Sequence, residues 1–187
     1  MIIAESKLIE IYTKNKDSFS VGKVYCQNDE QVVFEDIDTQ GKIIGYYAMK
    51  KNYISKLKYE TVYLKKIYLY MQYAKEHDYS GWFSLEKIKL DIDKSLFDQV
   101  INIAKKNNSI ITVGREEDDK LETAYVKDIY NEDITLECID ISNAKLYDEI
   151  TMKLNEINFI EFNSVDNLLL EYANKKMYNS KKLERMT

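Results

Sequence analysis

The 187-residue sequence contains no proline, five glycines, two cysteines, one histidine and one tryptophan. Two cysteines are too few for a disulfide framework, so we expect Cys26 and Cys138 to be free thiols in half-buried strands. A Ser-His-Asp or Cys-His catalytic site would have to use His77, which lies in a polar stretch without a Gly-x-Ser-x-Gly element. We therefore expect His77 to be a solvated linker residue.

Cofactor motifs are also missing from the sequence. No Cys and His residues have the spacing of a zinc site, and the few glycines form no phosphate-binding loop. We predict that the protein is not an enzyme and that it uses no metal or cofactor.

The chain has no uninterrupted apolar run close to the ~20 residues that cross a bilayer. Charged residues follow the first apolar residues at once, at Glu5 and Lys7, which argues against a signal peptide. The sequence therefore predicts a cytoplasmic protein that does not contact a membrane.

The net charge of −5 is unevenly distributed along the chain. Residues 1–75 carry 12 Lys and 9 acidic residues, whereas residues 76–187 carry 15 Lys and Arg and 23 acidic residues. A general nucleic-acid binder needs a concentrated basic surface. The acidic second part opposes polyanions, and only the first part could tolerate one.

Part of residues 21–59 is repeated later in the chain. Residues 34–38 read Phe-Glu-Asp-Ile-Asp and residues 136–140 read Leu-Glu-Cys-Ile-Asp, and a polar turn follows each. Further matches, at an offset one residue larger, pair residues 54 and 57 with residues 157 and 160. This duplication suggests two copies of a small β unit.

Polar and apolar residues alternate between Asn-, Asp- and Gly-rich turns, which predicts five short strands in each copy. The predicted strands are 8–12, 19–25, 31–38, 42–49 and 52–59, and then 110–115, 121–130, 134–141, 147–154 and 157–162. Apolar residues at helical spacing predict helices over 62–75, 93–107 and 165–177. Antiparallel strands this short and close together favour a small, strongly bent sheet or a barrel, since closure removes exposed sheet edges.

These strands resemble the Sm-like (SH3-type) barrel family. Residues 21–29 and 32–34, with Gly22 in the second strand, are similar to the first Sm motif, and residues 46–59 are similar to the second in apolar pattern. The whole arrangement also resembles uncharacterised bacterial or phage proteins with paired Sm-like domains, and the resemblance covers most of residues 7–64 and 94–164. The residues with which Sm proteins grip RNA are not matched, because Glu30 follows Asp29 and residues 50–52 contain no glycine.

The resemblance implies a β-rich α+β fold of two tandem five-stranded Sm-like barrels, each followed by an apolar helix, with a helical connector. The expected divisions are residues 1–76, 77–93 and 94–187. Ring assembly through the sheet edges is also implied by the resemblance.

Two sets of residues are candidates for binding. The first has nucleic-acid character, because Lys neutralises phosphates and Tyr stacks on bases; it comprises Lys50, Lys51, Tyr53, Lys56, Lys58 and Tyr59. The second suits a protein interface, where aromatic anchors dominate; it comprises Tyr63, Ile67, Tyr70, Trp82 and Phe83. The alternatives are a solvated strand edge for the first set and packing between the two β units for the second.

These observations predict a non-enzymatic binding module that acts through protein–protein interaction or self-association. The alternative is an RNA- or small-nucleotide-binding Sm-like protein that uses residues 50–59 or a cleft between the two barrels.

Overall fold

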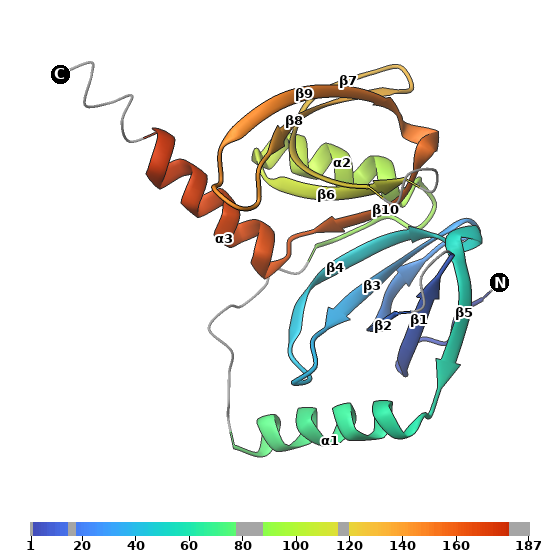
Figure 1. The fold of residues 1–187 in the computed structure, drawn as a ribbon. Coiled ribbons are helices and arrows are strands. Elements are labelled where there is room, and N and C mark those ends of the chain that lie inside the picture. Colours follow the sequence, from blue (N-terminus) through green and yellow to red (C-terminus); the bar gives the residue numbers. More distant parts are fainter. Residues whose placement is uncertain (1, 15–17, 78–87, 116–119, 180–187) are drawn as a thin grey trace. The chain divides into compact units, whose positions relative to one another are not determined.

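The computed structural model describes residues 2–14, 18–77, 88–115 and 120–179 (Figure 1). The chain divides into two compact units, Met1–Phe97 (unit 1) and Asp98–Thr187 (unit 2). Both cysteines are free thiols, as predicted; Cys26 is half-buried and Cys138 is buried. Burial, with the negative charge of Glu5 adding to it, raises the pKa of the Cys26 thiol to about 11. The thiol is therefore protonated and unreactive at neutral pH.

Unit 1 is an antiparallel sheet followed by a helix. Its elements are β1 (Leu8–Thr13), β2 (Phe19–Gln27), β3 (Gln31–Ile37), β4 (Ile43–Lys50), the 3₁₀ turn η1 (Lys51–Tyr53), β5 (Ile54–Tyr59) and α1 (Val62–Glu76). Strand β1 pairs with β2, β2 with β3 and β3 with β4, and β5 returns to pair with β1. The strand order is therefore β5-β1-β2-β3-β4.

The strands of unit 2 follow the same relative order as those of unit 1. After α2 (Leu96–Asn107), the elements are β6 (Ile110–Arg115), β7 (Leu121–Tyr130), β8 (Asp133–Ile139), β9 (Leu146–Lys153), the 3₁₀ turn η2 (Leu154–Glu156), β10 (Ile157–Phe162) and α3 (Val165–Asn174), which a π-helical turn (Lys175–Asn179) extends. The strand order in unit 2 is β10-β6-β7-β8-β9.

The prediction of closed barrels is wrong, because the strands form open antiparallel sheet. Among the described residues of unit 1, β4 and β5 do not pair with each other, and neither do β9 and β10 in unit 2. A barrel closes only when strand tilt and stagger bring its first and last strands into register. The sequence pattern specifies strands and turns, but it does not specify that tilt. The prediction of tandem Sm-like or SH3-type barrels, each followed by a helix, is therefore wrong.

The positions of individual strands and helices were predicted correctly to within a few residues. Two differences are at element starts: α2 begins at Leu96 rather than at residue 93, and η1 replaces the first residues of the strand predicted over 52–59. Local alternation and turn chemistry therefore locate the elements, although they do not decide how the sheet curves.

Gly22 has a structural role that does not depend on any Sm motif. A Cβ atom at this position in β2 would lie 2.9 Å from the backbone carbonyl oxygen of Glu35 in β3 and 3.0 Å from Cδ1 of Ile11. Gly41 has a different role, because its φ of +83° lies in the left-handed region and its Cβ would meet Met71 of α1 at 2.8 Å. The turn between β3 and β4 therefore approaches α1 closely.

Each unit has its own apolar core around a helix. In unit 1, Leu64 and Ile67 of α1 pack with Val21 and Ile37, and α1 follows the edge strand β5 (Figure 1). In unit 2, the corresponding cluster is Ile110, Tyr125, Ile139 and Ala144, against which Leu170 and Ala173 of α3 pack. The two helices α1 and α3 are thus held by one apolar stripe each, and their other faces point to solvent.

Candidate binding cavity in unit 2

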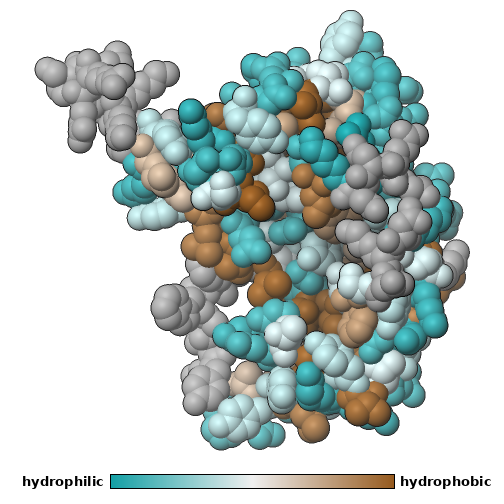
Figure 2. Space-filling view, viewed as in Figure 1, coloured by the Kyte–Doolittle hydropathy of each residue, from teal (hydrophilic) through white to brown (hydrophobic). Residues whose placement is uncertain are grey.

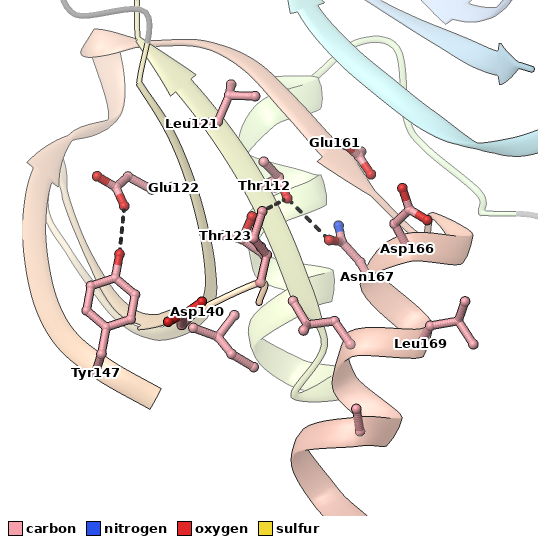
Figure 3. Close-up of a pocket in the computed structure, with 14 residues that line it drawn as sticks. Thr112, Leu121, Glu122, Thr123, Asp140, Tyr147, Glu161, Asp166, Asn167 and Leu169 are labelled. Carbon is pink, nitrogen blue, oxygen red and sulfur yellow. Dashed lines mark hydrogen bonds between the residues drawn. The ribbon is translucent and has the colours of Figure 1, made fainter. Parts of the chain in front are cut away.

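Unit 2 contains a cavity of about 770 Å³ between α3 and the sheet (Figure 3). This volume is in the range of sites that hold a small molecule or a few side chains. Its apolar lining residues are Leu121, Ile139, Ile141, Leu169, Leu170 and Ala173. Its polar lining residues are Thr112, Glu122, Thr123, Asp140, Tyr147, Glu161, Asp166 and Asn167.

The helix that forms one wall of the cavity is fixed at both ends. At its start, Ser164 is the N-cap: its Oγ accepts a hydrogen bond from the Asn167 backbone N–H at 3.3 Å and donates one to Glu161 at 2.5 Å. Toward its end, Asn174 donates to the backbone carbonyl of Ala144 at 2.8 Å. Ser and Asn at such positions satisfy backbone groups that would otherwise be unpaired. The cavity wall is therefore anchored to the end of β10 and to the turn before β9.

A buried polar network crosses from the sheet to α3. The Thr112 hydroxyl of β6 lies 3.0 Å from the Thr123 hydroxyl of β7 and donates to Oδ1 of Asn167 at 3.2 Å, as Figure 3 shows. Asn167 is only 5% exposed, and its Nδ2 has no hydrogen-bond partner among the described residues. A buried donor without a partner costs about 1–3 kcal/mol.

Glu122 is a buried carboxylate on the β7 side of the cavity. It forms an ion pair with Lys120 at 2.5 Å, and it accepts a hydrogen bond from the Tyr147 hydroxyl at 3.3 Å (Figure 3). The Cys138 thiol lies 3.9 Å from the same carboxylate. Burial first, and then the charge of Glu122, raises the pKa of the Cys138 thiol, so this cysteine is not a nucleophile at neutral pH.

Two of the other carboxyl groups of the cavity, those of Glu161 and Asp140, have pKa values that are shifted for different reasons. Burial raises the pKa of Glu161, and the charge of Asp166 raises it further against the opposing hydrogen bond from Ser164. Hydrogen bonds from the Ser142 hydroxyl and backbone lower the pKa of Asp140, which closes the turn after β8. Glu161 therefore faces the cavity as a group that resists ionisation, whereas Asp140 is held ionised by its turn.

The cavity is acidic and partly apolar. Four of its described lining residues carry carboxyl groups, and no Lys, Arg or His is among the described lining residues. Within the described ranges, no three His, Cys, Asp or Glu side chains gather closely enough to hold a metal ion. The arrangement favours a ligand that combines positive charge with apolar surface.

The residues predicted for nucleic-acid binding do not share one open face. Tyr53 is buried, and the Lys51 ammonium donates to the backbone carbonyl of Asn28 at 2.6 Å, where burial lowers its pKa. On the edge strand β5, the ammonium groups of Lys58 and Lys56 lie 4.8 Å and 6.0 Å from the centre of the Tyr12 ring. Of the two further members of the set, Lys50 is half-buried and Tyr59 is exposed.

Of the residues predicted for a protein interface, Ile67 belongs to the core of unit 1 instead. Tyr63 is half-buried and forms an edge contact with Phe19 at 5.3 Å, while Tyr70 is exposed. Trp82 and Phe83 lie outside the described residues. Besides Tyr70, the exposed apolar side chains of α1 are Val62, Tyr68, Leu69 and Tyr73. Figure 2 shows hydrophobic residues among hydrophilic ones over α1, at the bottom of the view.

His77 ends α1, where its backbone N–H bonds to the carbonyl of Tyr73 at 3.1 Å and its ring stacks on the Tyr73 ring at 4.1 Å. It is exposed, as predicted for a solvated residue, but it belongs to the helix end rather than to a linker.

The acidic cavity was not among the predicted sites, although α3 carried a signal for it. Asn167 and Asn174 are seven residues apart and share the buried helix face with Leu170. Amides on the apolar stripe of a helix are unusual, because a buried amide needs hydrogen-bond partners. That pattern could have indicated a polar site under α3.

Comparison with family models, curated proteins and solved structures finds no match to this chain. The Sm-like family suggested by the strand pattern thus has no support beyond that pattern. In the described part of the chain, every helix is too short or too polar to cross a bilayer.

Proposed function

We propose that this protein is a non-enzymatic binding module that recognises a segment of a partner protein in the acidic cavity of unit 2. The observation that carries the proposal is the combination of an anchored wall and a mixed lining. Ser164 and Asn174 fix α3 in place, and the cavity beneath it presents both carboxylates and apolar side chains. A pre-formed site of this kind limits the entropy lost on binding.

The chemistry of the cavity supports binding better than catalysis. Cys138 has a raised pKa, and the sole histidine of the sequence belongs to unit 1. The carboxylates of Glu122 and Asp140 already accept hydrogen bonds from their own surroundings. These groups hold the shape and charge of the site rather than forming a nucleophile and base pair.

Self-association is the second part of the proposal, and it rests on α1. Leu69 is 60% exposed and Tyr73 is 55% exposed, one turn apart on the helix. Exposed apolar residues that cluster on one element often mark protein contacts. RNA binding through residues 50–59 stays a prediction, and the burial of Tyr53 and the bond made by Lys51 do not favour it.

A selection from a displayed library of random peptides, with the full chain immobilised, tests the main proposal. Hydrogen–deuterium exchange of the protein with an enriched peptide then locates the site. We expect protection at Leu121–Thr123 and in the first two turns of α3. Failure to enrich any peptide, or protection confined to unit 1, would contradict the proposal.

A further inference from the structure

One end of the cavity carries two carboxyl groups that form no ion pair with a cationic side chain among the described residues. Glu161 is the second-last residue of β10 and Asp166 lies in the first turn of α3, and the charge of Asp166 raises the pKa of Glu161. The described ion pairs of unit 2 include neither of them. Two like charges at one place repel each other, and a cation between them would remove that repulsion.

Asn167 gives a second, independent indication of a ligand at the same end of the cavity. Its Oδ1 is occupied by Thr112, while its buried Nδ2 lacks a partner in the described residues. Turning the amide over would only exchange an unpaired donor for an unpaired acceptor. The terminal torsion of an Asn side chain is broad, so a small rotation can present the amide to a ligand. Figure 3 shows Glu161, Asp166 and Asn167 next to one another at the start of α3.

The cavity that these polar groups line also has apolar side chains. Leu121 at the start of β7 and Leu169 on α3 are both exposed and both line the cavity. A ligand that fits all three features has a positive head, an apolar stem and a nearby hydrogen-bond acceptor. Lys and Arg side chains in a polypeptide have this composition, because their methylene stems lie on apolar surface while the charged head stays polar.

We propose that the Glu161–Asp166 end of the cavity binds a Lys or Arg side chain of the partner protein, with a main-chain carbonyl of the same segment accepting a hydrogen bond from Asn167. The inference rests on the proposed function, since it names the chemical group that the cavity reads in its partner. The cationic head lies against the two carboxylates, and the stem lies along Leu121 and Leu169.

The test uses Nα-acetyl-lysine N-methylamide as the probe and ¹⁵N-labelled full chain. Nα-acetyl-norleucine N-methylamide has the same backbone and a similar stem without the cation, so it is the matched control ligand. We expect the lysine probe to shift the side-chain amide signals of Asn167 saturably, and the norleucine probe to bind at least roughly fivefold more weakly, which corresponds to about 1 kcal/mol.

Two variants separate a local effect from a general charge effect. Asp166→Asn removes one carboxylate of the site, and Asp128→Asn removes one carboxylate of β7 that pairs with Lys105 outside the cavity. We expect Asp166→Asn to weaken lysine-probe binding and Asp128→Asn to leave it unchanged. Equal weakening by both variants, or equal binding of both probes, would overturn the inference.

A free amine distinguishes the source of the cation. If pentylamine binds as tightly as the lysine probe, the site does not read a peptide carbonyl, and the assignment to a protein side chain is overturned. If selected peptides bind at α3 but contain no Lys or Arg, this inference fails while the proposed function stands. If the lysine probe shifts Asn167 but no peptide is ever enriched, the proposed function is the part that fails.

Discussion

Buried and half-buried polar side chains decide much of the behaviour of this protein at the scale of single residues. Glu161 and Asp140 both belong to the cavity, but their surroundings move their pKa values in opposite directions. Burial disfavours the charged form of Glu161, whereas hydrogen bonds favour the charged form of Asp140. The two residues therefore make opposite contributions to the pH dependence of stability.

The pKa of Glu161 is raised in the folded state. At pH values between the unfolded and the folded pKa, the folded protein therefore retains a proton that the unfolded chain has released. Stability from this group is complete below the ordinary Glu pKa of about 4.3 and declines as pH rises toward the folded value. Glu161→Gln removes that decline. We expect the variant to melt at a higher temperature than the wild type at pH 7–8, by ~2–4 °C for each kcal/mol, and to lose this advantage near pH 4.

Asp140→Asn is expected to behave in the opposite way. The depressed pKa of Asp140 contributes stability above the ordinary Asp pKa, and that contribution is lost as pH falls through the folded value. The variant should therefore melt below the wild type at neutral pH, with the gap closing in acid. Thermal scans of both variants across pH 3–8 check the pair, and equal signs for the two variants would contradict the assignment.

Gly22 gives a prediction about packing between neighbouring strands. An added Cβ would press on the rigid backbone oxygen of Glu35 at 2.9 Å, and overpacking of this kind costs about 1–3 kcal/mol. Gly114 in β6 is the control, because its Cβ would meet the movable end of the Leu121 side chain at 3.0 Å. Urea denaturation should show a clear loss of unfolding free energy for Gly22→Ala and a smaller loss for Gly114→Ala. The reverse order would be inconsistent with this geometry.

At the scale of elements, strands and helices follow from local patterns, while the cavity depends on contacts between distant residues. Alternation predicted the strands β6 to β10. The cavity forms only when Thr112, Tyr147 and Asn167 line the same space, and these residues belong to three different elements. No local pattern specifies that meeting, and the same limit explains why strand positions were predicted and closure was not.

The start of α1 depends on a single hydroxyl group. Thr61 Oγ1 accepts from the Leu64 backbone N–H at 3.1 Å and donates to the buried carboxylate of Glu10 at 2.5 Å. Thr61→Ala removes both bonds, and we expect it to cost ~1–2 kcal/mol of unfolding free energy, as lost helix caps do. Thr61→Ser keeps the hydroxyl and should restore most of the stability in urea denaturation. A Ser variant as unstable as the Ala variant would show that the methyl group matters instead.

At the scale of the whole molecule, the comparison of the sequence with tandem Sm-like barrels led to a wrong fold prediction. Turn residues and alternation occur in many small sheets, so they identify neighbouring strands without identifying a family. The charge asymmetry was more informative, because the acidic second part of the chain contains the acidic cavity of unit 2.

Self-association through α1 can be measured as the mass in solution. If the exposed face of α1 joins copies of the chain, the mass should exceed the 22.1 kDa of one chain. Leu69→Asp together with Tyr73→Asp should then reduce it to that of a monomer, because burying an unpaired charge at an interface is costly. Light scattering gives the mass and circular dichroism checks the fold. A wild-type protein that is strictly monomeric at high concentration would contradict self-association.

Two neighbouring leucines of α3 test the binding cavity most directly. Leu169, which is 49% exposed, lines the cavity, whereas Leu168, which is 37% exposed, does not. Leu169→Arg places a cation beside the carboxylates and removes apolar wall, and Leu168→Arg introduces the same charge on a neighbouring face. The decisive measurement is calorimetric titration of a library-selected peptide into the wild type and both variants. We expect only Leu169→Arg to abolish binding; equal affinity for Leu169→Arg and the wild type would contradict a binding site in this cavity.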